Sequence, residues 1–194
     1  MTSPLSLYVH IPFCASLCYY CACNKIITGN YQKAMDYLGD IKREIDLLLP
    51  HLGQSQTVSQ VHLGGGTPTY FKDAELSDLM QLLQSAFQWQ VGGEYAIEVD
   101  PRTVNDERLH HLWAMGFNRL SLGIQDFDPK VQEAVHRMQS FDQVSALIDT
   151  ARGIGFSSIN LDLIYGLPKQ TISGWHNTLD SVLQLRPERL ALYG

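Results

Sequence analysis

Six short apolar runs recur along the chain, and each has the length of a buried β-strand. Between them lie longer stretches in which apolar residues recur every three or four positions, the spacing of an amphipathic helix. Strands that are separated by helices pair in parallel through right-handed crossovers. The predicted strands cover residues 5–11, 58–66, 94–100, 119–125, 158–166 and 188–194. This alternation predicts an α/β fold.

The predicted helices carry end signals as well as periodicity. Gly116 stands where a left-handed residue can end a helix, and Ser140 precedes Gln143 by three residues, the spacing of a capping box. Asp73 is a candidate cap for the second helix. The predicted helices cover residues 31–49, 74–87 and 105–115, a fourth that begins at Ser140, and a fifth that begins at Ser173 and ends before Pro187.

Two architectures fit this alternation: an open doubly wound sheet, and a barrel or partial barrel. Both place ligands at the carboxyl ends of the strands. In this sequence the first strand runs into a cysteine-rich loop, and later strands end in "GGGTP", "EVDP", "GIQDF" and "DLIYGLP". We therefore expect a functional site built from the strand ends.

Composition narrows the range of partners and compartments. The chain has 194 residues, 45% of them hydrophobic, and a formal net charge of −6. A negative charge disfavours nucleic acid as the main partner, and no apolar run approaches the roughly 18 residues of a membrane span. The first residues do not have the pattern of a secretion signal, so we expect a cytoplasmic protein.

All four cysteines lie in one short segment with the spacing C-x3-C-x2-C-x-C, at Cys14, Cys18, Cys21 and Cys23. Clustered cysteines in a reducing compartment bind metal or do chemistry more often than they form disulfides. A zinc ribbon usually adds a second pair well downstream, which this chain lacks. Thiolates from one loop suit an iron–sulfur cube, with a zinc site or buried structural thiols as alternatives.

The spacing of Cys14, Cys18 and Cys21 after the first strand resembles the signature of the radical S-adenosylmethionine (SAM) superfamily. The resemblance implies that these cysteines ligate a [4Fe–4S] cluster whose fourth iron binds the amino and carboxylate groups of SAM. The reduced cluster would cleave SAM to methionine and a 5′-deoxyadenosyl radical. The resemblance also implies a TIM-like partial (β/α)6 barrel with parallel strands, which agrees with the six predicted strands.

Further motifs resemble the oxygen-independent coproporphyrinogen III oxidase family over essentially the whole chain. They read "LYVHIPFC", "CACNK", "GGGTPTY", "IEVDPR", "NRLSLGIQDF" and "DLIYGLPKQT". The family implies an oxidoreductase of heme and porphyrin biosynthesis that decarboxylates coproporphyrinogen III to protoporphyrinogen IX. It also implies an electron donor such as a flavodoxin or ferredoxin, and we expect a monomer.

The family resemblance implies two SAM molecules, with contacts at the strand ends. Tyr8 and Gly65 would contact the first SAM, and Glu98 would bind a ribose or ammonium group. Arginine can grip a carboxylate in two places, which suits the amino-acid end of SAM. Contacts to the second SAM would come from Tyr20, Gly66, Thr67, Gln125, Arg137 and Asp162.

The fourth cysteine, Cys23, is not among the implied ligands. The family places it close to the reaction site, which makes it a catalytic candidate of unsettled role. The alternative is a fourth ligand, which would close the cube and prevent SAM from binding iron.

The substrate implied by the family bears four carboxylates, whereas the chain is negatively charged overall. Binding would need a local cationic patch, because global charge does not decide local potential. The candidates for this patch are Lys25, Arg102 and Arg137.

The resemblance implies that residues 1–194 form a truncated radical SAM core, without the carboxyl-terminal domain and amino-terminal extension of the family. Full activity of this chain alone is therefore not implied. Two other functions stay open at this point. One is a related heme chaperone that keeps the cluster and inserts heme into proteins. The other is an iron–sulfur electron carrier or a zinc-binding module without SAM chemistry.

Overall fold

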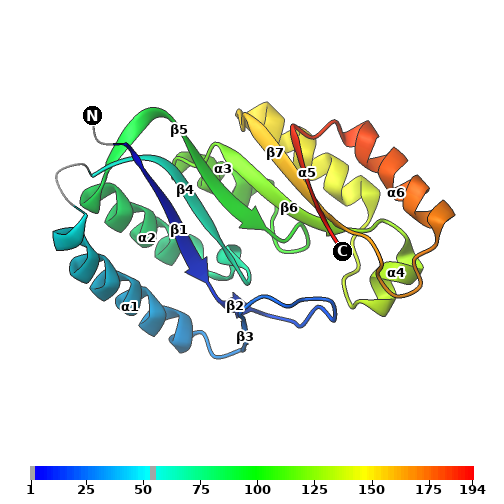
Figure 1. Ribbon diagram of the computed structural model, residues 1–194, viewed down its shortest axis with the longest axis horizontal. Helices are drawn as coiled ribbons and strands as arrows, with labels where there is room; N and C mark the ends of the chain where they lie inside the picture. The colour runs from blue at the N-terminus through cyan, green and yellow to red at the C-terminus, as the bar shows by residue number, and fades with distance from the viewer. Residues whose placement is uncertain (1–2, 53–55) are drawn as a thin grey trace.

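The computed structural model describes residues 3–52 and 56–194. Its chain alternates strands and helices around one large parallel sheet (Figure 1). The strands of this sheet are β1 (Leu5–Ile11), β4 (Thr57–Gly65), β5 (Gln88–Val99), β6 (Arg119–Gln125), β7 (Ser158–Ile164) and β8 (Arg189–Tyr193). The helices are α1 (Gln32–Leu48), α2 (Asp73–Ala86), α3 (Asp106–Ala114), α4 (Pro129–Ala134), α5 (Phe141–Ile154) and α6 (Ile172–Leu185), with the 3-10 turns η1 (Leu49–His51) and η2 (Pro68–Tyr70).

The order of the strands distinguishes the two candidate architectures. Across the described ranges the sheet has six strands in the order β1-β4-β5-β6-β7-β8, and every neighbouring pair is parallel. This order follows the chain without reversal, whereas a doubly wound sheet reverses at its switch point. Right-handed crossovers that all step in one direction keep the helices on one face of the sheet. The predicted partial (β/α)6 barrel is therefore confirmed.

Alternation along the strands separates an apolar outer face from a polar inner face. In β4, Val61 and Leu63 are buried, whereas His62 between them is half-buried. In β7, Leu163 is buried, whereas Asp162 is half-buried on the opposite face. The buried strand residues form one core with apolar side chains of α1, α2, α3, α5 and α6. The helices thus cover the apolar face, and the polar face is left for a site.

The start of α2 differs from its prediction, whereas the end of α3 agrees with it. Asp73 is the first residue of α2, and the N-cap is Lys72, whose side chain makes no capping hydrogen bond. Asp73 instead pairs with Arg108 and His111 of α3. Its carboxylate in the first turn also complements the helix dipole. Gly116, after α3, has the predicted left-handed conformation, with φ of +100°.

Hydroxyl side chains cap two of the later helices. Ser140 caps α5 and accepts a hydrogen bond from the N–H of Gln143, as its spacing predicts. The prediction that α6 opens at Ser173 was wrong, because Thr171 is the N-cap and accepts from the N–H of Gly174. A threonine cap two residues earlier thus adds part of a turn to α6.

The apolar pattern missed short or interrupted elements. The strand β5 begins at Gln88 rather than at residue 94. The prediction missed its first half because Gly92 and Gly93 interrupt the apolar run. Helix α4 has only six residues and starts with a proline. The pair β2 (Phe13–Cys14) and β3 (Ile26–Ile27) is also too short to leave a period in the sequence. Among the described residues, no helix is both long enough and apolar enough to span a bilayer.

Candidate functional site

The cysteine loop is held at the carboxyl end of β1 by the glycine segment that follows β4. The N–H of Gly66 donates to the carbonyl of Ile11, and the N–H of Thr67 donates to the carbonyl of Phe13, both at 2.8 Å. At its far end the loop returns through β3, which pairs in parallel with β2. The loop is therefore fastened at both ends to the strand that carries it.

Gly66 has no room for a side chain. A Cβ at this position would lie 2.7 Å from the carbonyl oxygen of Pro12 and 2.9 Å from Sγ of Cys14. These contacts are closer than real Cβ atoms make, and one of them is to the backbone. Glycine is therefore required where the two strand ends meet.

Three of the four thiols are half-buried in the loop, and all four are free. Burial raises the pKa of Cys14, and the neighbouring sulfurs of Cys21 and Cys18 add to this rise. The hydroxyl of Thr67 donates to Sγ of Cys14 at 3.5 Å and acts in the opposite direction. Cys14, Cys18 and Cys21 thus lie on one loop, near enough for the charges of Cys18 and Cys21 to act on Cys14, and their ligation of a cluster stays a prediction.

Cys23 is exposed and follows Cys21 by two residues in the same loop. Burial, followed by the charge of Cys21, raises the pKa of Cys23 to about 11. The carboxylate of Glu98 adds to the same rise. Cys23 is thus close to both a cluster thiol and a predicted SAM contact. Its role, catalytic group or fourth ligand, stays a prediction.

Two arginines point at the sulfur of Cys18. Arg102 Nη2 lies 3.8 Å and Arg137 Nη1 lies 3.6 Å from Sγ of Cys18. Both arginines also pair with Asp100, at 2.6 Å and 3.4 Å respectively. Burial alone would raise the pKa of Asp100, but the hydrogen bonds of Arg102 and the charge of Arg137 lower it. N–H donors aimed at a ligand sulfur stabilise a negatively charged cluster.

The three cations predicted to receive the substrate have partners within the protein. Lys25 Nζ donates to the carbonyls of Cys21 and Cys23, at 2.6 Å and 3.3 Å. Arg102 and Arg137 are engaged with the acid and thiol described above. The geometry therefore assigns these cations first to holding the cysteine loop.

Residues that follow α4 also fasten the loop. The N–H of Tyr19 donates to the carbonyl of Val135 at 3.0 Å. His136 Nδ1 hydrogen-bonds to the carbonyl of Leu17 at 2.9 Å, and its ring stacks on Tyr19 at 5.4 Å. Because α4 was not predicted, the contact of His136 with the cysteine loop could not be anticipated from the sequence.

The donor set fits an iron–sulfur cube. In the part of the chain that the structure describes, no group of three or more His, Cys, Asp or Glu side chains is placed to hold a single metal ion. An iron–sulfur cube does not require its ligands to converge on one metal ion, because each thiolate binds a separate iron. Three half-buried thiols on one loop satisfy this requirement. Cys14, Cys18 and Cys21 would hold three corners and leave the fourth open.

The predicted contacts of the first SAM lie side by side on the inner face. Glu98, in β5, accepts a hydrogen bond from the N–H of Gly65 at 3.1 Å. Its other oxygen bonds to Nε2 of His62 at 3.0 Å. The ring of Tyr8 stacks on His62, with 5.7 Å between centroids and 14° between planes. The structure therefore brings Tyr8, Gly65 and Glu98 together, through a histidine that sequence reasoning missed.

Two of the residues predicted to hold the second SAM, Gln125 in β6 and Asp162 in β7, come from the other half of the sheet. Gln125 ends β6 with φ of +69°, and its buried Oε1 has no hydrogen-bond partner among the described residues. A buried acceptor without a donor is costly, so a ligand donor would fit there. Burial raises the pKa of Tyr20, which lies near Arg137 and Cys18. Arg137 donates to the carbonyl of Gly123 at 2.8 Å, so gripping a carboxylate would require an exchange of partners.

Asp162 is a second half-buried carboxylate on the inner face. Burial raises its pKa to about 6, against an opposing hydrogen bond from Asn160, and the charge of Glu98 adds to the rise. Its hydrogen bonds from Ser121 at 3.5 Å are long. The charge of Glu98 in β5 thus acts on Asp162 in β7 across β6.

We expect Asp162→Asn to change how stability depends on pH. A folded-state pKa above the ordinary value means that the stabilising contribution of Asp162 is complete below about pH 4 and lost as pH rises through about 6. The variant should therefore gain about 2 kcal/mol over the natural protein between pH 4 and pH 8. Urea unfolding at both pH values measures this gain. Asp180→Asn, at an exposed position of α6, is the control, and equal pH profiles for Asp162→Asn and the natural protein would refute the assignment.

The residues that sequence reasoning missed around the site are polar side chains whose hydrogen-bond partners lie on neighbouring strands or in the loops at the strand ends. They are His10, His62, Asp100, Ser121, Asn160 and His136. The inward direction of His62 could have been predicted. His62 and Gly64 are two residues apart in β4, and alternate residues of a strand face the same side of the sheet. The register between β4 and β5, which brings His62 to Glu98, was not available from the sequence.

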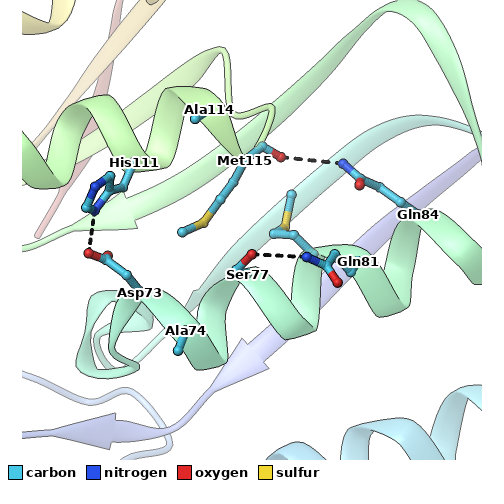
Figure 2. A pocket seen from close by; sticks show the side chains of 9 residues that line it. Asp73, Ala74, Ser77, Gln81, Gln84, His111, Ala114 and Met115 are labelled. Carbon is cyan, nitrogen blue, oxygen red and sulfur yellow. Dashed lines mark hydrogen bonds and ion pairs between the residues drawn. The ribbon is translucent and has the colours of Figure 1, made fainter.

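A separate cavity lies on the helix side of the sheet. It measures about 450 Å³ and opens between α2 and α3. Figure 2 shows two hydrogen bonds that join these helices across it, from His111 to Asp73 at 2.5 Å and from Gln84 to the carbonyl of Met115 at 3.5 Å. These bonds mark the cavity as a seam between packed helices, apart from the strand ends.

Comparisons with known proteins agree with this geometry. The family model of the Radical SAM superfamily matches residues 8–182. Oxygen-independent coproporphyrinogen III oxidases of Pseudomonas aeruginosa and Escherichia coli are 48% and 52% identical over 98% of this chain, and the chain spans 42% and 41% of their lengths. The chain thus covers less than half of these relatives.

Solved structures give the same result. The structure of the Escherichia coli coproporphyrinogen III oxidase, described as a radical SAM enzyme, superposes with a TM-score of 0.92 at 51% identity, over 98% of this chain and 44% of that one. A radical SAM methyltransferase from Kitasatospora setae, at 13% identity and a TM-score of 0.67, shares the fold. With three thiols on the loop after β1 and a glycine segment after β4, this chain belongs to the radical SAM superfamily.

Proposed function

We propose that this chain is the radical SAM core of an oxygen-independent coproporphyrinogen III oxidase. The observation that carries the proposal is the 51% identity and TM-score of 0.92 to the Escherichia coli enzyme over 98% of this chain. Cys14, Cys18 and Cys21 would hold a [4Fe–4S] cluster in the shielded mouth of the partial barrel. With SAM bound, the reduced cluster supplies a 5′-deoxyadenosyl radical.

The chain's own residues would bind and orient the first SAM. Tyr8, Gly65 and Glu98 lie next to the cysteine loop, and Glu98 is already fixed by two hydrogen bonds. Its carboxylate would receive a ribose hydroxyl or an ammonium group, either of which offsets the cost of a half-buried charge. These residues thus orient a ligand without supplying redox chemistry themselves.

A second SAM would lie toward β6 and β7. The orphaned Oε1 of Gln125 is an acceptor that awaits a donor. Asp162, on the neighbouring strand, would accept from a hydroxyl or ammonium group in the same region. The full proposed set for this ligand is Tyr20, Gly66, Thr67, Gln125, Arg137 and Asp162.

The proposed reaction converts two propionate side chains of the substrate to vinyl groups. For each one, the 5′-deoxyadenosyl radical would supply the means to remove a hydrogen atom from the β-carbon. Breakage of the carbon–carboxylate bond would then release carbon dioxide, and one electron would pass to an acceptor as the double bond formed. The protein's share is binding, orientation and exclusion of water and oxygen. A flavodoxin or ferredoxin would reduce the cluster, and we expect the chain to act as a monomer.

The experiment that tests the proposal separates SAM cleavage from substrate turnover. The protein is reconstituted anaerobically with iron and sulfide, reduced with dithionite and given SAM, and 5′-deoxyadenosine is measured by chromatography. We expect 5′-deoxyadenosine from the natural chain and none from Cys14→Ala. A cluster-loaded natural chain that forms none would contradict the proposal. Added coproporphyrinogen III then tests decarboxylation directly.

The same preparation tests the alternative functions. Tight stoichiometric heme binding without decarboxylation would favour a heme chaperone. Zinc alone after anaerobic purification would favour a zinc-binding module. The names and structures of the relatives described above favour the oxidase.

A further inference from the structure

His62 lies between two residues that the proposed function assigns to SAM. It stands in β4 and pairs in register with Tyr8 of β1. Its Nε2 lies 3.0 Å from Oε1 of Glu98, which comes from β5 on the other side. Its ring is stacked on the ring of Tyr8. One imidazole therefore contacts both neighbours, from two different strands.

The hydrogen bond of His62 completes the fixation of Glu98. Oε2 of Glu98 accepts from the N–H of Gly65 at 3.1 Å, and Oε1 is left for His62. Because a carboxylate only accepts, Nε2 of His62 carries the proton and donates it. Both side chains are about one-third exposed, so the bond is partly sheltered from water. With a donor on each oxygen, the carboxylate plane has one orientation.

Gly64 in β4 leaves room for the side chains of Glu98 and Tyr8, and a side chain at this position would collide with both. A Cβ on Gly64 would lie 2.6 Å from Oε1 of Glu98 and 3.0 Å from Cε2 of Tyr8. Both side chains therefore lean over the backbone of β4, directly beside His62. The hydroxyl of Tyr8 in turn contacts Nδ1 of His10 at 3.2 Å. Nε2 of His10 contacts the carbonyl of Asn24 at 2.8 Å. The cluster of contacts extends from β5 to the cysteine loop.

We propose that His62 is a positioning residue for SAM, which orients Glu98 through its Nε2–H and supports the ring of Tyr8 through its face. The inference rests on the proposed function, because it assumes that Tyr8 and Glu98 contact SAM. His62 acts through these residues and does not touch the reacting atoms.

The two contributions of His62 can be separated by two substitutions. His62→Phe keeps an aromatic face for Tyr8 but removes the donor to Glu98. His62→Gln keeps an N–H donor at a similar reach but removes the ring. Loss of a sheltered hydrogen bond to a charged group should weaken SAM binding about tenfold in the Phe variant. Loss of the stack alone should weaken it about threefold in the Gln variant.

The test uses anaerobically reconstituted full-length chain and measures SAM directly. The readouts are the dissociation constant of radiolabelled SAM by equilibrium dialysis and the change that SAM produces in the EPR spectrum of the reduced cluster. His111→Phe is the matched control. Like His62, His111 pairs with a carboxylate, but its partner is Asp73 and the pair lies on the outer helices. We expect His111→Phe to bind SAM like the natural chain.

The outcomes separate this inference from the function on which it rests. If the natural chain binds SAM and His62→Phe binds it equally well, the positioning role is wrong and the proposed function stands. If the natural chain does not bind SAM, both are wrong.

A double-mutant cycle tests whether His62 acts through Glu98. His62→Phe should add little to the loss of SAM affinity already caused by Glu98→Gln, because coupled residues are not additive. Losses that multiply would show that His62 acts apart from Glu98 and would overturn the inference. Should His62→Phe fail to load a cluster, His62→Asn replaces it, because its shorter amide cannot reach Glu98. Natural SAM affinity in that variant would be equally decisive against the inference.

Discussion

We expect Cys18→Ala to abolish the cluster absorbance at about 400 nm, whereas Cys23→Ala should keep it. Cys18 is one of three half-buried thiols and receives N–H groups from both Arg102 and Arg137. Removing the Cys18 thiol leaves the cluster with only two of its three proposed ligands. It also leaves Arg102 and Arg137 without their sulfur acceptor. Cys23 is exposed and lies at the edge of this group, so the cube should form without it.

The measurement is the absorbance spectrum and iron content of each variant after anaerobic reconstitution. Circular dichroism of both variants is the control for folding. If both are folded, a difference in iron content reports on ligation of the cluster. Equal loss of iron in the two variants would mean that Cys23 is a fourth ligand. It would also remove the open iron that SAM requires.

Gly66→Ala is expected to disrupt cluster loading, although Gly66 is not itself a proposed cluster ligand. The added methyl group would lie 2.7 Å from the carbonyl oxygen of Pro12 and 2.9 Å from Sγ of Cys14. Relief of this contact must move the backbone of the cysteine loop, at a cost of about 1–3 kcal/mol. We expect a lower unfolding free energy and a large loss of bound iron.

Gly153→Ala is the matched control for this substitution. A Cβ on Gly153 meets nothing within 4 Å, and the residue lies within α5. Alanine should stabilise the helix there by about 0.5–1 kcal/mol and leave iron binding unchanged. Urea unfolding and iron analysis of both variants provide the comparison. Full iron content in Gly66→Ala would show that the close approach is not needed for the site.

Much of the fold could be predicted because it depends on patterns within single elements. The apolar runs of β6 and β7 are mostly buried strands, and β1 is an edge strand with alternating exposure; all three leave a pattern in the sequence. Elements that lack such a period were missed. Helix α4 has six residues, and β2 and β3 have two each, so their positions depend on tertiary contacts.

The candidate site divides along the same line. The cysteines and the glycine segment could be identified because each is one continuous motif. The pairing of His62 with Glu98 could not, since it depends on the register between β4 and β5. The engagement of Arg137 with Cys18 joins residues 119 positions apart. Contacts of this kind require the folded structure.

A cube held by three thiolates should leave its fourth iron open to SAM. The EPR spectrum of the reduced, reconstituted protein, recorded with and without SAM, tests this claim. We predict that SAM shifts the spectrum of the natural chain and of Cys23→Ala alike. A spectrum that stays the same when SAM is added, in protein that carries a full cluster, would contradict the claim.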